Sequence, residues 1–415
     1  MRKKVYFKTF GCRTNLYDSQ VMMSSLKGYD ITENEDEADI VVVNSCTVTN
    51  GADTHVRSYI GHVEKVSNAK IFLTGCGAHT KGKKLLEEKR VQGVFGQSEK
   101  QNVDRLLANE QPFYELGDLN HIDDMVVDDF VGKSRAFIKI QEGCSFLCSY
   151  CIIPYVRGDA RSMDESRILE QITRLASNGF GEFILTGTNV GSYGQRVGTS
   201  IAKLMKKISQ IRGVRRIRVG SVEPVQIGDE FKEILDEPWL EKHLHIALQH
   251  TSPKMLKLMN RRNVYNQDRE LFEFLADKGF AIGTDFITGH PGESEEIWRE
   301  AMINARELPL THIHSFTYSK RDGTPSAHMK PDVNGRVAKE RLHELDSLIK
   351  EKNYDFRKNV AVDLKVLIES QKNGLYQGFD QYFNKILIDS DEDLVGNWLD
   401  IKNYEVKEEC NYAKL

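Results

Sequence analysis

The first 108 residues alternate between short apolar runs and amphipathic segments. The predicted strands lie at 5–10, 38–44 and 70–74, and the predicted helices lie near 15–26, 53–66 and 81–90. The second run is almost continuously apolar, which is typical of a strand covered on both faces. Strands that alternate with helices predict a parallel sheet. We therefore expect an amino-terminal α/β domain of three βα units over residues 1–110.

A second, longer alternation occupies residues 137 to about 352. Its strand-like runs, with helical patterns between them, are 137–141, 182–186, 216–221, 243–249, 283–287 and 312–318. Six βα repeats are too few for an eight-stranded barrel and predict a partial (β/α)6 barrel over residues 135–355. On such a barrel the functional groups lie at the carboxyl ends of the strands.

Two further stretches differ from this alternation. Residues 111–134 are polar and acidic without a helical period, which predicts a linker. In the tail, 358–415, hydrophobic positions recur with a period near two, which predicts antiparallel strands of a small β-barrel. Counted over 359–415, six lysines stand against eleven aspartates and glutamates, a net charge of −5.

The composition is that of a globular protein. Apolar residues make up 40% of the 415 and charged residues 28%. No apolar run approaches the ~18 residues that a membrane span requires, and no apolar signal region precedes the first strand. These features predict a cytoplasmic protein that does not associate with membranes. Because the net charge is −4, a nucleic-acid partner would have to be held by local basic patches.

Three cysteines lie close together just after the first barrel strand. Cys144, Cys148 and Cys151, here called the barrel triad, have the spacing C-x3-C-x2-C, and Tyr150 precedes the last of them. Three thiolates leave one iron of a four-iron cluster without a protein ligand, and a catalytic metal site keeps such an open position. The alternatives are a zinc knuckle that lacks a ligand and a chance cluster of buried cysteines.

Three other cysteines each follow a strand of the amino-terminal domain. Cys12, Cys46 and Cys76, here called the amino-terminal triad, are 34 and 30 residues apart. The loops beyond the carboxyl ends of parallel strands gather in one crevice, so we expect these residues to meet. A second cluster with one open iron is the natural inference, and small buried residues that pack at strand ends are the alternative. Such cysteine usage suits metal ligation in a reducing compartment, with Cys410 as a non-ligand thiol.

Together these motifs resemble the methylthiotransferase family of radical S-adenosylmethionine (SAM) enzymes. The resemblance covers essentially the whole chain and is most specific at 9–15, 43–49, 141–158 and 318–325. It implies a three-cysteine domain, a radical SAM partial barrel and a carboxy-terminal β-barrel of the TRAM type. Residues 44–49 and 185–194 are similar to the branch that modifies N6-threonylcarbamoyladenosine in tRNA. The isopentenyladenosine and ribosomal-protein branches differ around the first cysteine.

The resemblance implies a reaction that uses two 4Fe–4S clusters and two SAM molecules. The cluster on the barrel triad reduces SAM to a 5′-deoxyadenosyl radical, which removes a hydrogen from an adenine carbon. The cluster on the amino-terminal triad holds a sulfur that a second SAM methylates and the carbon radical takes up. An aromatic C–H has no useful acidity, so the cofactor must supply the radical. The implied partners are tRNA, an electron donor such as flavodoxin or ferredoxin, and a sulfur donor, but not DNA.

Further site residues are assigned by their positions near strand ends. Tyr150 is expected to pack near the adenine of SAM. The candidates for the methionine amino group of SAM are Thr186, Gly187, Thr188 and Asn189. The candidates for binding SAM or the substrate base are Glu223, Gln249 and Asp285. For Asp285 the alternative is a carboxylate that caps a turn. The candidate partners of a phosphate, or of a threonylcarbamoyl carboxylate, are Arg157, Arg161 and Arg321.

Two other functions stay open on the sequence alone. One is the same chemistry on another substrate, either isopentenyladenosine in tRNA or a ribosomal-protein aspartate. The ribosomal-protein substrate would need a tail that binds protein, and the acidic tail keeps that alternative open. An iron–sulfur electron carrier or RNA-binding protein is the other, and it predicts closed four-ligand sites. The chain also departs from the family pattern: Ala247 replaces a proline, and His250, Thr251 and Ser252 replace an expected Ser-Gly-Ser.

Overall fold

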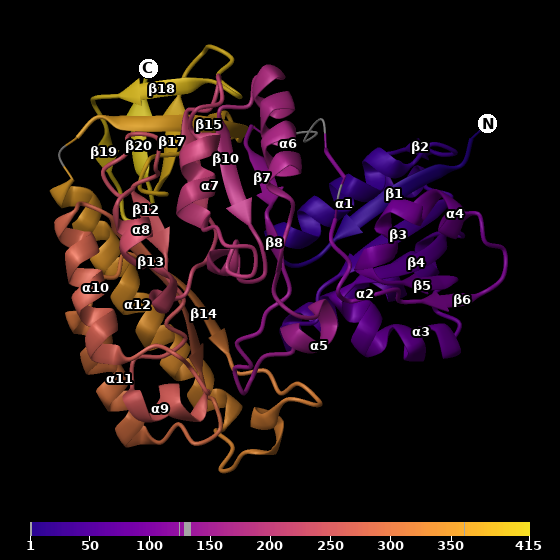
Figure 1. The fold of residues 1–415 in the computed structure, drawn as a ribbon, viewed down its shortest axis with the longest axis horizontal. Helices are drawn as coiled ribbons and strands as arrows, with labels where there is room; N and C mark the ends of the chain where they lie inside the picture. The colour runs from indigo at the N-terminus through magenta and orange to yellow at the C-terminus, as the bar shows by residue number, and fades with distance from the viewer. Residues whose placement is uncertain (1, 124, 128–133, 361) are drawn as a thin grey trace.

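The computed structural model describes residues 2–123, 125–127, 134–360 and 362–415 and builds them around three sheet systems (Figure 1). The amino-terminal sheet has six parallel strands in the order β2-β1-β3-β4-β5-β6. Its elements are β1 (Lys4–Thr9), α1 (Arg13–Ser25), β2 (Asp30–Ile31), β3 (Ile40–Ser45), α2 (Asn50–Val66), β4 (Lys70–Gly75), α3 (Lys83–Glu87), β5 (Gly93–Phe95), α4 (Val103–Leu107) and β6 (Phe113–Glu115).

The three predicted strands are confirmed as β1, β3 and β4, which are neighbours in this sheet. Strand β3 is covered on both faces: Val41 and Val43 pack in one hydrophobic core, and Ile40 and Val42 pack in another. The pattern missed β2, β5 and β6, because strands of two or three residues are too short to display a period.

The central part is the predicted partial (β/α)6 barrel. Its six parallel strands are β7 (Ala136–Lys139), β10 (Glu182–Thr186), β11 (Arg216–Val219), β12 (His243–His245), β13 (Ala281–Thr288) and β14 (His312–Thr317). The bridge Val222↔Ile246 joins the sheet of β7, β10 and β11 to the sheet of β12, β13 and β14. The associated elements are β8 (Gln141–Glu142), α5 (Ile153–Arg157), β9 (Arg161–Ser162), α6 (Glu165–Ser177), α7 (Ile201–Ile208), α8 (Asp229–Lys232), α9 (Pro253–Leu258), α10 (Tyr265–Asp277), α11 (Glu295–Glu307) and α12 (Gly335–Asn359).

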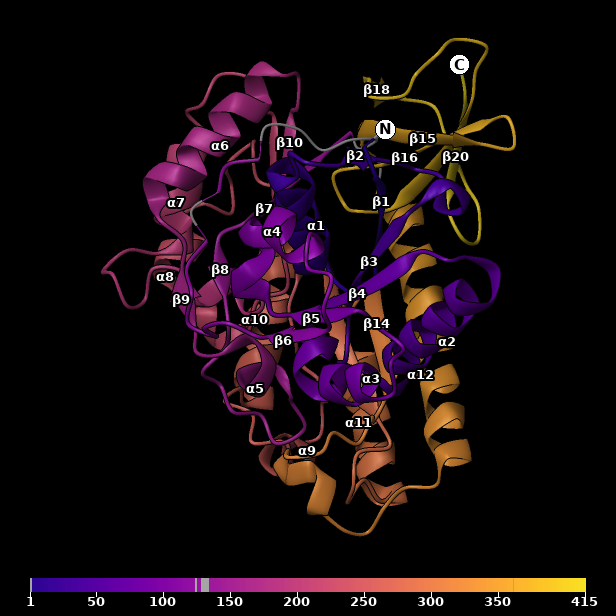
Figure 2. The ribbon, with the colours of Figure 1, turned by 90° about the vertical axis from the view of Figure 1, so that its right-hand side faces the viewer.

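Helix α1 joins the amino-terminal sheet to the barrel. It packs against β7 (Figure 2), and its residues Tyr17 and Val21 lie in the hydrophobic core of the barrel. The stretch predicted as a linker contributes to the same junction, because Asp123 is buried and pairs with Lys100 at 2.5 Å. Strand β6 also falls within that stretch. Within the stretch 111–134, residues 124 and 128–133 lie outside the described part of the chain.

The tail forms the third sheet, in the order β18-β15-β16-β17-β20-β19. Its strands are β15 (Leu364–Lys372), β16 (Leu375–Phe379), β17 (Lys385–Asp389), β18 (Trp398–Ile401), β19 (Glu405–Val406) and β20 (Asn411–Lys414). The pairings are antiparallel as predicted, except that β17 and β20 run parallel. Arg216 of β11 donates to Lys365 O (3.0 Å) and docks this sheet on the barrel. No helix in the described ranges has the length and apolar character that a membrane crossing would need.

Candidate active site

The amino-terminal triad lies beyond the ends of three adjacent strands, β1, β3 and β4. Gly11 adopts φ +97°, and a Cβ built on it would lie 2.6 Å from the Cβ of Cys46 and 2.9 Å from its Sγ. Only glycine combines that backbone conformation with so close an approach. Cys46 and Cys76 are buried and Cys12 is exposed. The loops carrying Cys12 and Cys46 are therefore in direct contact, with one thiol at the surface.

The barrel triad occupies the loop between β8 and α5. The backbone N–H of Cys144 donates to Gly158 O (3.0 Å), and that of Cys151 donates to Cys148 O (3.0 Å). Two side chains from other barrel loops reach the sulfur atoms: Asn189 Nδ2 is 3.4 Å from Cys144 Sγ, and Arg261 Nη1 is 3.6 Å from Cys148 Sγ. N–H donors of this kind stabilise thiolates and metal-bound sulfur.

The number of thiolates in each triad bears on the metal that it could hold. A structural zinc site is closed by four protein ligands, and each triad offers three thiolates. Three thiolates leave one iron of a four-iron cluster without a protein ligand, which suits a cluster better than a closed zinc knuckle. Outside the triads, potential ligand atoms of His245, Asp285 and His314 all lie within 4.8 Å of one another.

Helix α5 brings the two triads together. It begins two residues after Cys151, and Ile152 and Val156 pack directly against Cys76. Arg157, which ends this helix and is 1% exposed, donates from Nε to Cys76 Sγ at 3.2 Å. The next residue, Gly158, accepts the hydrogen bond from Cys144 described above. The peptide 157–158 therefore contacts both cysteine sites.

Arg157 also belongs to a buried ion network at the junction of the barrel and the amino-terminal sheet. Its Nη1 donates to Asp18 Oδ2 (2.9 Å) and to Glu142, and its Nη2 donates to Asn15 Oδ1 (2.5 Å). Lys139 donates to the same two carboxylates. Burial raises the carboxyl pKa values, but the cations outweigh it. Lys100, Lys139 and Arg157 hold the pKa of Asp18 well below its usual range, and chiefly Lys139 and Arg157 lower that of Glu142 to about 2. Both acids are therefore anionic.

Burial sets the protonation of the thiols. It raises the pKa of Cys46 and of Cys151 to about 12 each. Burial also raises the pKa of Cys76 and of Cys148, but Arg157 opposes it at the first and Arg261 at the second. Each triad thus contains one sulfur at which a guanidinium opposes the effect of burial and favours the thiolate, the form that binds metal.

The residues predicted to contact SAM lie around the barrel triad. The backbone N–H of Asn189 donates to Gln141 Oε1 (2.8 Å), which fixes the position of Asn189. The hydroxyl of Thr188 donates to Gly143 O (2.9 Å). A Cβ on Gly187 would lie 2.7 Å from Gln141 O. Tyr150 packs in a small apolar cluster and meets the ring of His290 edge-on at 6.4 Å. Gln141 is a positioning residue that the sequence analysis missed.

Glu223 pairs with a second residue that the sequence analysis missed. Arg261 Nη1 donates to Glu223 Oε1 (2.9 Å) and Nη2 donates to Oε2. Burial raises the pKa of Glu223, and Arg261 opposes that shift. Arg261 therefore joins this carboxylate to Cys148.

Gln249 and Asp285 lie deeper, where histidines line the barrel. Gln249 adopts φ +67° and its N–H donates to Asp285 O (2.8 Å). Asp285 Oδ1 is 3.0 Å from His245 Nε2 and 3.5 Å from His314 Nδ1. Burial raises the pKa of Asp285, but these two imidazoles outweigh it and keep the pKa below the usual range. The Asp285 carboxylate therefore contacts the side chains of His245 and His314 and does not cap a turn.

The three candidate arginines are all engaged by protein groups. Arg157 is buried as described, which leaves it no free edge for a phosphate. Arg161 donates from Nε to His121 O (2.6 Å) and from Nη1 to Arg157 O (2.8 Å). Arg321 donates to Asp53 Oδ2 (2.5 Å) and to Asn50 Oδ1 (2.6 Å). Their contact with substrate stays a prediction, and for Arg157 the geometry favours a structural role.

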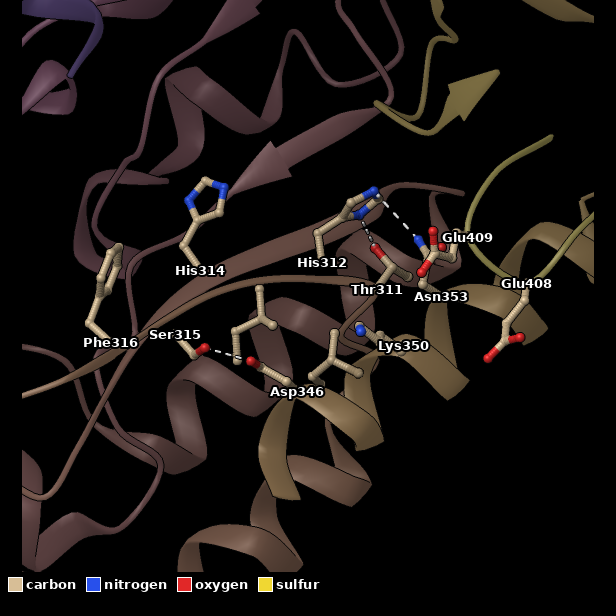
Figure 3. A pocket seen from close by; sticks show the side chains of 12 residues that line it. Thr311, His312, His314, Ser315, Phe316, Asp346, Lys350, Asn353, Glu408 and Glu409 are labelled. Carbon is tan, nitrogen blue, oxygen red and sulfur yellow. Dashed lines mark hydrogen bonds between the residues drawn. The ribbon is translucent and has the colours of Figure 1, made fainter. Parts of the chain in front are cut away.

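Two cavities lie near these residues. One, of about 590 Å³, lies beside β14, where His314 and Phe316 point to one side of the strand and Ser315 turns to Asp346 of α12 (Figure 3). The other, of about 340 Å³, lies between α2, α5 and the loop after β14. Its lining residues include Thr47, which follows Cys46, and Ile152, which follows Cys151. Residues that directly follow one cysteine of each triad therefore line the second cavity.

Comparison with known proteins gives a consistent picture. Residues 4–96 match the family described as "Uncharacterized protein family UPF0004", and residues 138–303 match the Radical SAM superfamily. A Helicobacter pylori (strain J99) protein provisionally named a methylthiotransferase is 54% identical over 99% of both chains. The Bacillus subtilis "Threonylcarbamoyladenosine tRNA methylthiotransferase MtaB" is 32% identical and covers 96% of this chain and 93% of its own.

Two further similarities complete the comparison. The Wolinella succinogenes "tRNA-2-methylthio-N(6)-dimethylallyladenosine synthase" is 33% identical over 90% of this chain and 89% of its own. The solved structure of the radical SAM methyltransferase TsrM from Kitasatospora setae superposes with a TM-score of 0.60 at 14% identity. It covers 79% of this chain and 77% of that one. This similarity shows that the fold is also that of a known radical SAM enzyme.

Proposed function

Because the chain belongs to the methylthiotransferase family of radical SAM enzymes, we propose that it attaches a methylthio group to the adenine of N6-threonylcarbamoyladenosine beside the anticodon of tRNA. Members of this family are sulfur-transferring enzymes, and the radical SAM superfamily binds SAM and a 4Fe–4S cluster. The tRNA substrate, the particular hypermodified base and the presence of two clusters are parts of the proposal. So are a cytoplasmic location, a sulfur donor and an electron donor such as flavodoxin or ferredoxin.

One observation carries the proposal: helix α5 and Arg157 join the two cysteine sites. A radical SAM enzyme with one cluster needs no contact between its SAM loop and a second set of thiols. Here Arg157 Nε donates to Cys76 Sγ, and Gly158 O accepts from Cys144 N. Methylthiolation uses both sites on one substrate carbon, which accounts for such a link.

The chain's own residues would hold and orient the groups. The barrel triad would bind a 4Fe–4S cluster with SAM on its open iron, and the amino-terminal triad would bind a second cluster with the sulfur to be transferred. When bound, the clusters and SAM supply the radical and the sulfur. Asn189 and Arg261 donate N–H groups to Cys144 and Cys148 and so fix two ligands.

The nature of the modified adenosine is the finer part of the proposal. Relatives named for threonylcarbamoyladenosine and for dimethylallyladenosine match the chain at similar identity. The threonylcarbamoyl group carries a carboxylate, and the cationic side chains Lys81, Lys320 and Arg321 line the cavity of about 340 Å³. This charge favours the threonylcarbamoyl substrate over the neutral one.

The test is an anaerobic assay with a matched variant. Wild type and a Cys12→Ala/Cys46→Ala/Cys76→Ala variant are reconstituted, iron and sulfide are counted, and each protein receives reductant, SAM and total tRNA. Nucleosides are then analysed by mass spectrometry. We expect two clusters in wild type and one in the variant, with a methylthio mass gain on threonylcarbamoyladenosine in wild type alone.

Other outcomes redirect or reject the proposal. A mass gain on dimethylallyladenosine assigns the other tRNA substrate. Unchanged tRNA with two intact clusters contradicts tRNA modification, and ribosomal protein becomes the next substrate to assay, in line with the acidic tail. One cluster in both proteins contradicts the second site.

A further inference from the structure

The cavity of about 340 Å³ between α2, α5 and the loop after β14 concentrates positive charge in a chain whose net charge is −4. Three cationic side chains line it: Lys81, Lys320 and Arg321. The carboxylates in its wall are Asp53 and Asp322. The formal sum is three positive and two negative charges, hence +1.

The acids do not neutralise the lysines. Asp53 is occupied by the protein, because Oδ1 accepts from Thr47 (2.8 Å) and Oδ2 accepts from Arg321 (2.5 Å). Lys81 and Lys320 are both exposed, and within the described ranges neither ammonium has a carboxylate within 4.0 Å. Two free ammonium groups therefore line one hollow, with Asp322 as the remaining acid.

The cavity also has an aromatic wall that is open to solvent. Tyr155 of α5 is 51% exposed and lines the cavity with Ile152. An exposed ring beside cations is the combination on which an unstacked base and its anionic substituent can bind.

The position of the cavity relates it to the reaction. Thr47 directly follows Cys46, Ile152 directly follows Cys151, and Lys81 lies five residues after Cys76. Ile152 also packs against Cys76. A group bound here is therefore next to residues of both cysteine sites.

We propose that this cavity binds an anionic group of the RNA substrate through Lys81 and Lys320, beside the base that is modified. This inference rests on the proposed function and deepens it. Two sources share the chemistry: the carboxylate of a threonylcarbamoyl group and a backbone phosphate. An ammonium attracts either anion as a point charge. Arg321, fixed by Asp53 and Asn50, forms the wall behind them.

The test compares three RNAs on the full chain with its clusters reconstituted. They are one anticodon stem-loop synthesised with threonylcarbamoyladenosine, with dimethylallyladenosine or with plain adenosine at the same position. Dissociation constants are measured by fluorescence anisotropy without SAM, so that no turnover is needed. The proteins are wild type, Lys81→Ala/Lys320→Ala, and the charge-preserving Lys81→Arg/Lys320→Arg. The matched control is Lys83→Ala/Lys330→Ala, which removes two exposed lysines outside the cavity.

We expect the alanine pair to weaken binding of the threonylcarbamoyl RNA about tenfold, the usual scale of a lost charge-assisted contact. Binding of the other two RNAs should change less than twofold, and the arginine pair and the control should behave as wild type. An equal loss on all three RNAs identifies the phosphate as the anion bound. An unchanged affinity for all three RNAs overturns the inference.

Failure of this inference is distinguishable from failure of the proposed function. If wild type binds the threonylcarbamoyl RNA through the two lysines but transfers no methylthio group to it, the function is wrong and the cavity stands. If wild type modifies that RNA and the alanine pair binds it equally well, the function stands and the cavity is wrong. Iron content and thermal unfolding of each variant show whether the fold is intact.

Discussion

Arg157 Nε lies 3.2 Å from Cys76 Sγ, although the two residues are 81 apart in sequence and belong to different sheet systems. The arginine ends the helix that directly follows the barrel triad, so the segment that positions one set of cysteines also holds a member of the other. A substitution of Arg157 should therefore affect both cysteine triads.

Replacing Arg157 with alanine should strongly destabilise the protein. The substitution leaves Asp18 and Glu142 anionic with one buried cation fewer, and breaking a buried pair costs about 3–5 kcal/mol. The free energy of unfolding in urea measures the loss. Arg167→Ala, at an exposed pair with Glu170, should cost less than about 1 kcal/mol. Equal losses for the two variants would argue against a buried role.

Arg157→Lys separates the sulfur contact from the charge. A lysine preserves the positive charge but cannot reach Cys76, Asp18 and Asn15 together as the planar guanidinium does. We expect normal iron on the barrel triad and a shifted reduction potential for the amino-terminal cluster, read by EPR-monitored titration of wild type and variant. An unchanged potential would show that the Cys76 contact does not tune that cluster.

Glu142 should make stability depend on acid pH. Its pKa in the folded protein is about 2, below its ordinary value of 4.5. A lowered carboxyl pKa gives stability that is fully present above the unfolded pKa and is lost as the pH falls from about 4.5 towards 2. The contribution is about 3 kcal/mol for a shift of this size. Urea unfolding of Glu142→Gln should therefore show a flatter pH dependence between pH 5 and pH 3 than wild type does. Parallel curves would contradict the assignment.

Gly11→Ala should impair the amino-terminal triad selectively. The new Cβ would lie 2.6 Å from the Cβ of Cys46 at a backbone φ of +97°, a strain of about 1–3 kcal/mol. We expect the reconstituted iron content to fall towards that of one cluster while SAM cleavage to 5′-deoxyadenosine persists. Gly228→Ala is the control, because its φ is ordinary and no atom lies within 4 Å of the added methyl. A full iron content in Gly11→Ala would contradict the close contact between the loops that carry Cys12 and Cys46.

Arg261→Gln should act on the barrel triad instead. It removes the N–H groups that reach Cys148 and Glu223 and leaves the partly buried Glu223 carboxylate without its cation. Uncoupled SAM cleavage should fall at least tenfold, while the amino-terminal cluster is retained. Glu223→Gln made in the Arg261→Gln background should restore stability, since the unpaired charge is removed. SAM cleavage at the wild-type rate in Arg261→Gln would exclude this role.

The sequence by itself determined the class of fold and the two cysteine sets. The run 38–44 is almost continuously apolar, which indicates burial on both faces. The cysteines follow strand ends, and a parallel sheet gathers the loops beyond those ends at one edge. The sequence could not determine the hydrogen-bond and ion-pair partners of Arg157. Exposed and buried arginines look alike in a sequence, because pairing across 139 residues, as with Asp18, leaves no local signal.

Only the tertiary structure decided which groups are free to meet a substrate. The arginines expected to bind an anion proved to be engaged by Asp18, Glu142, Asp53 and backbone carbonyls, whereas Lys81 and Lys320 have no carboxylate partner in the described ranges. The physical reason is that a charge binds whatever opposite charge the fold places nearest to it. That distance follows from packing between segments far apart in the chain, not from the residue type or its neighbours in sequence.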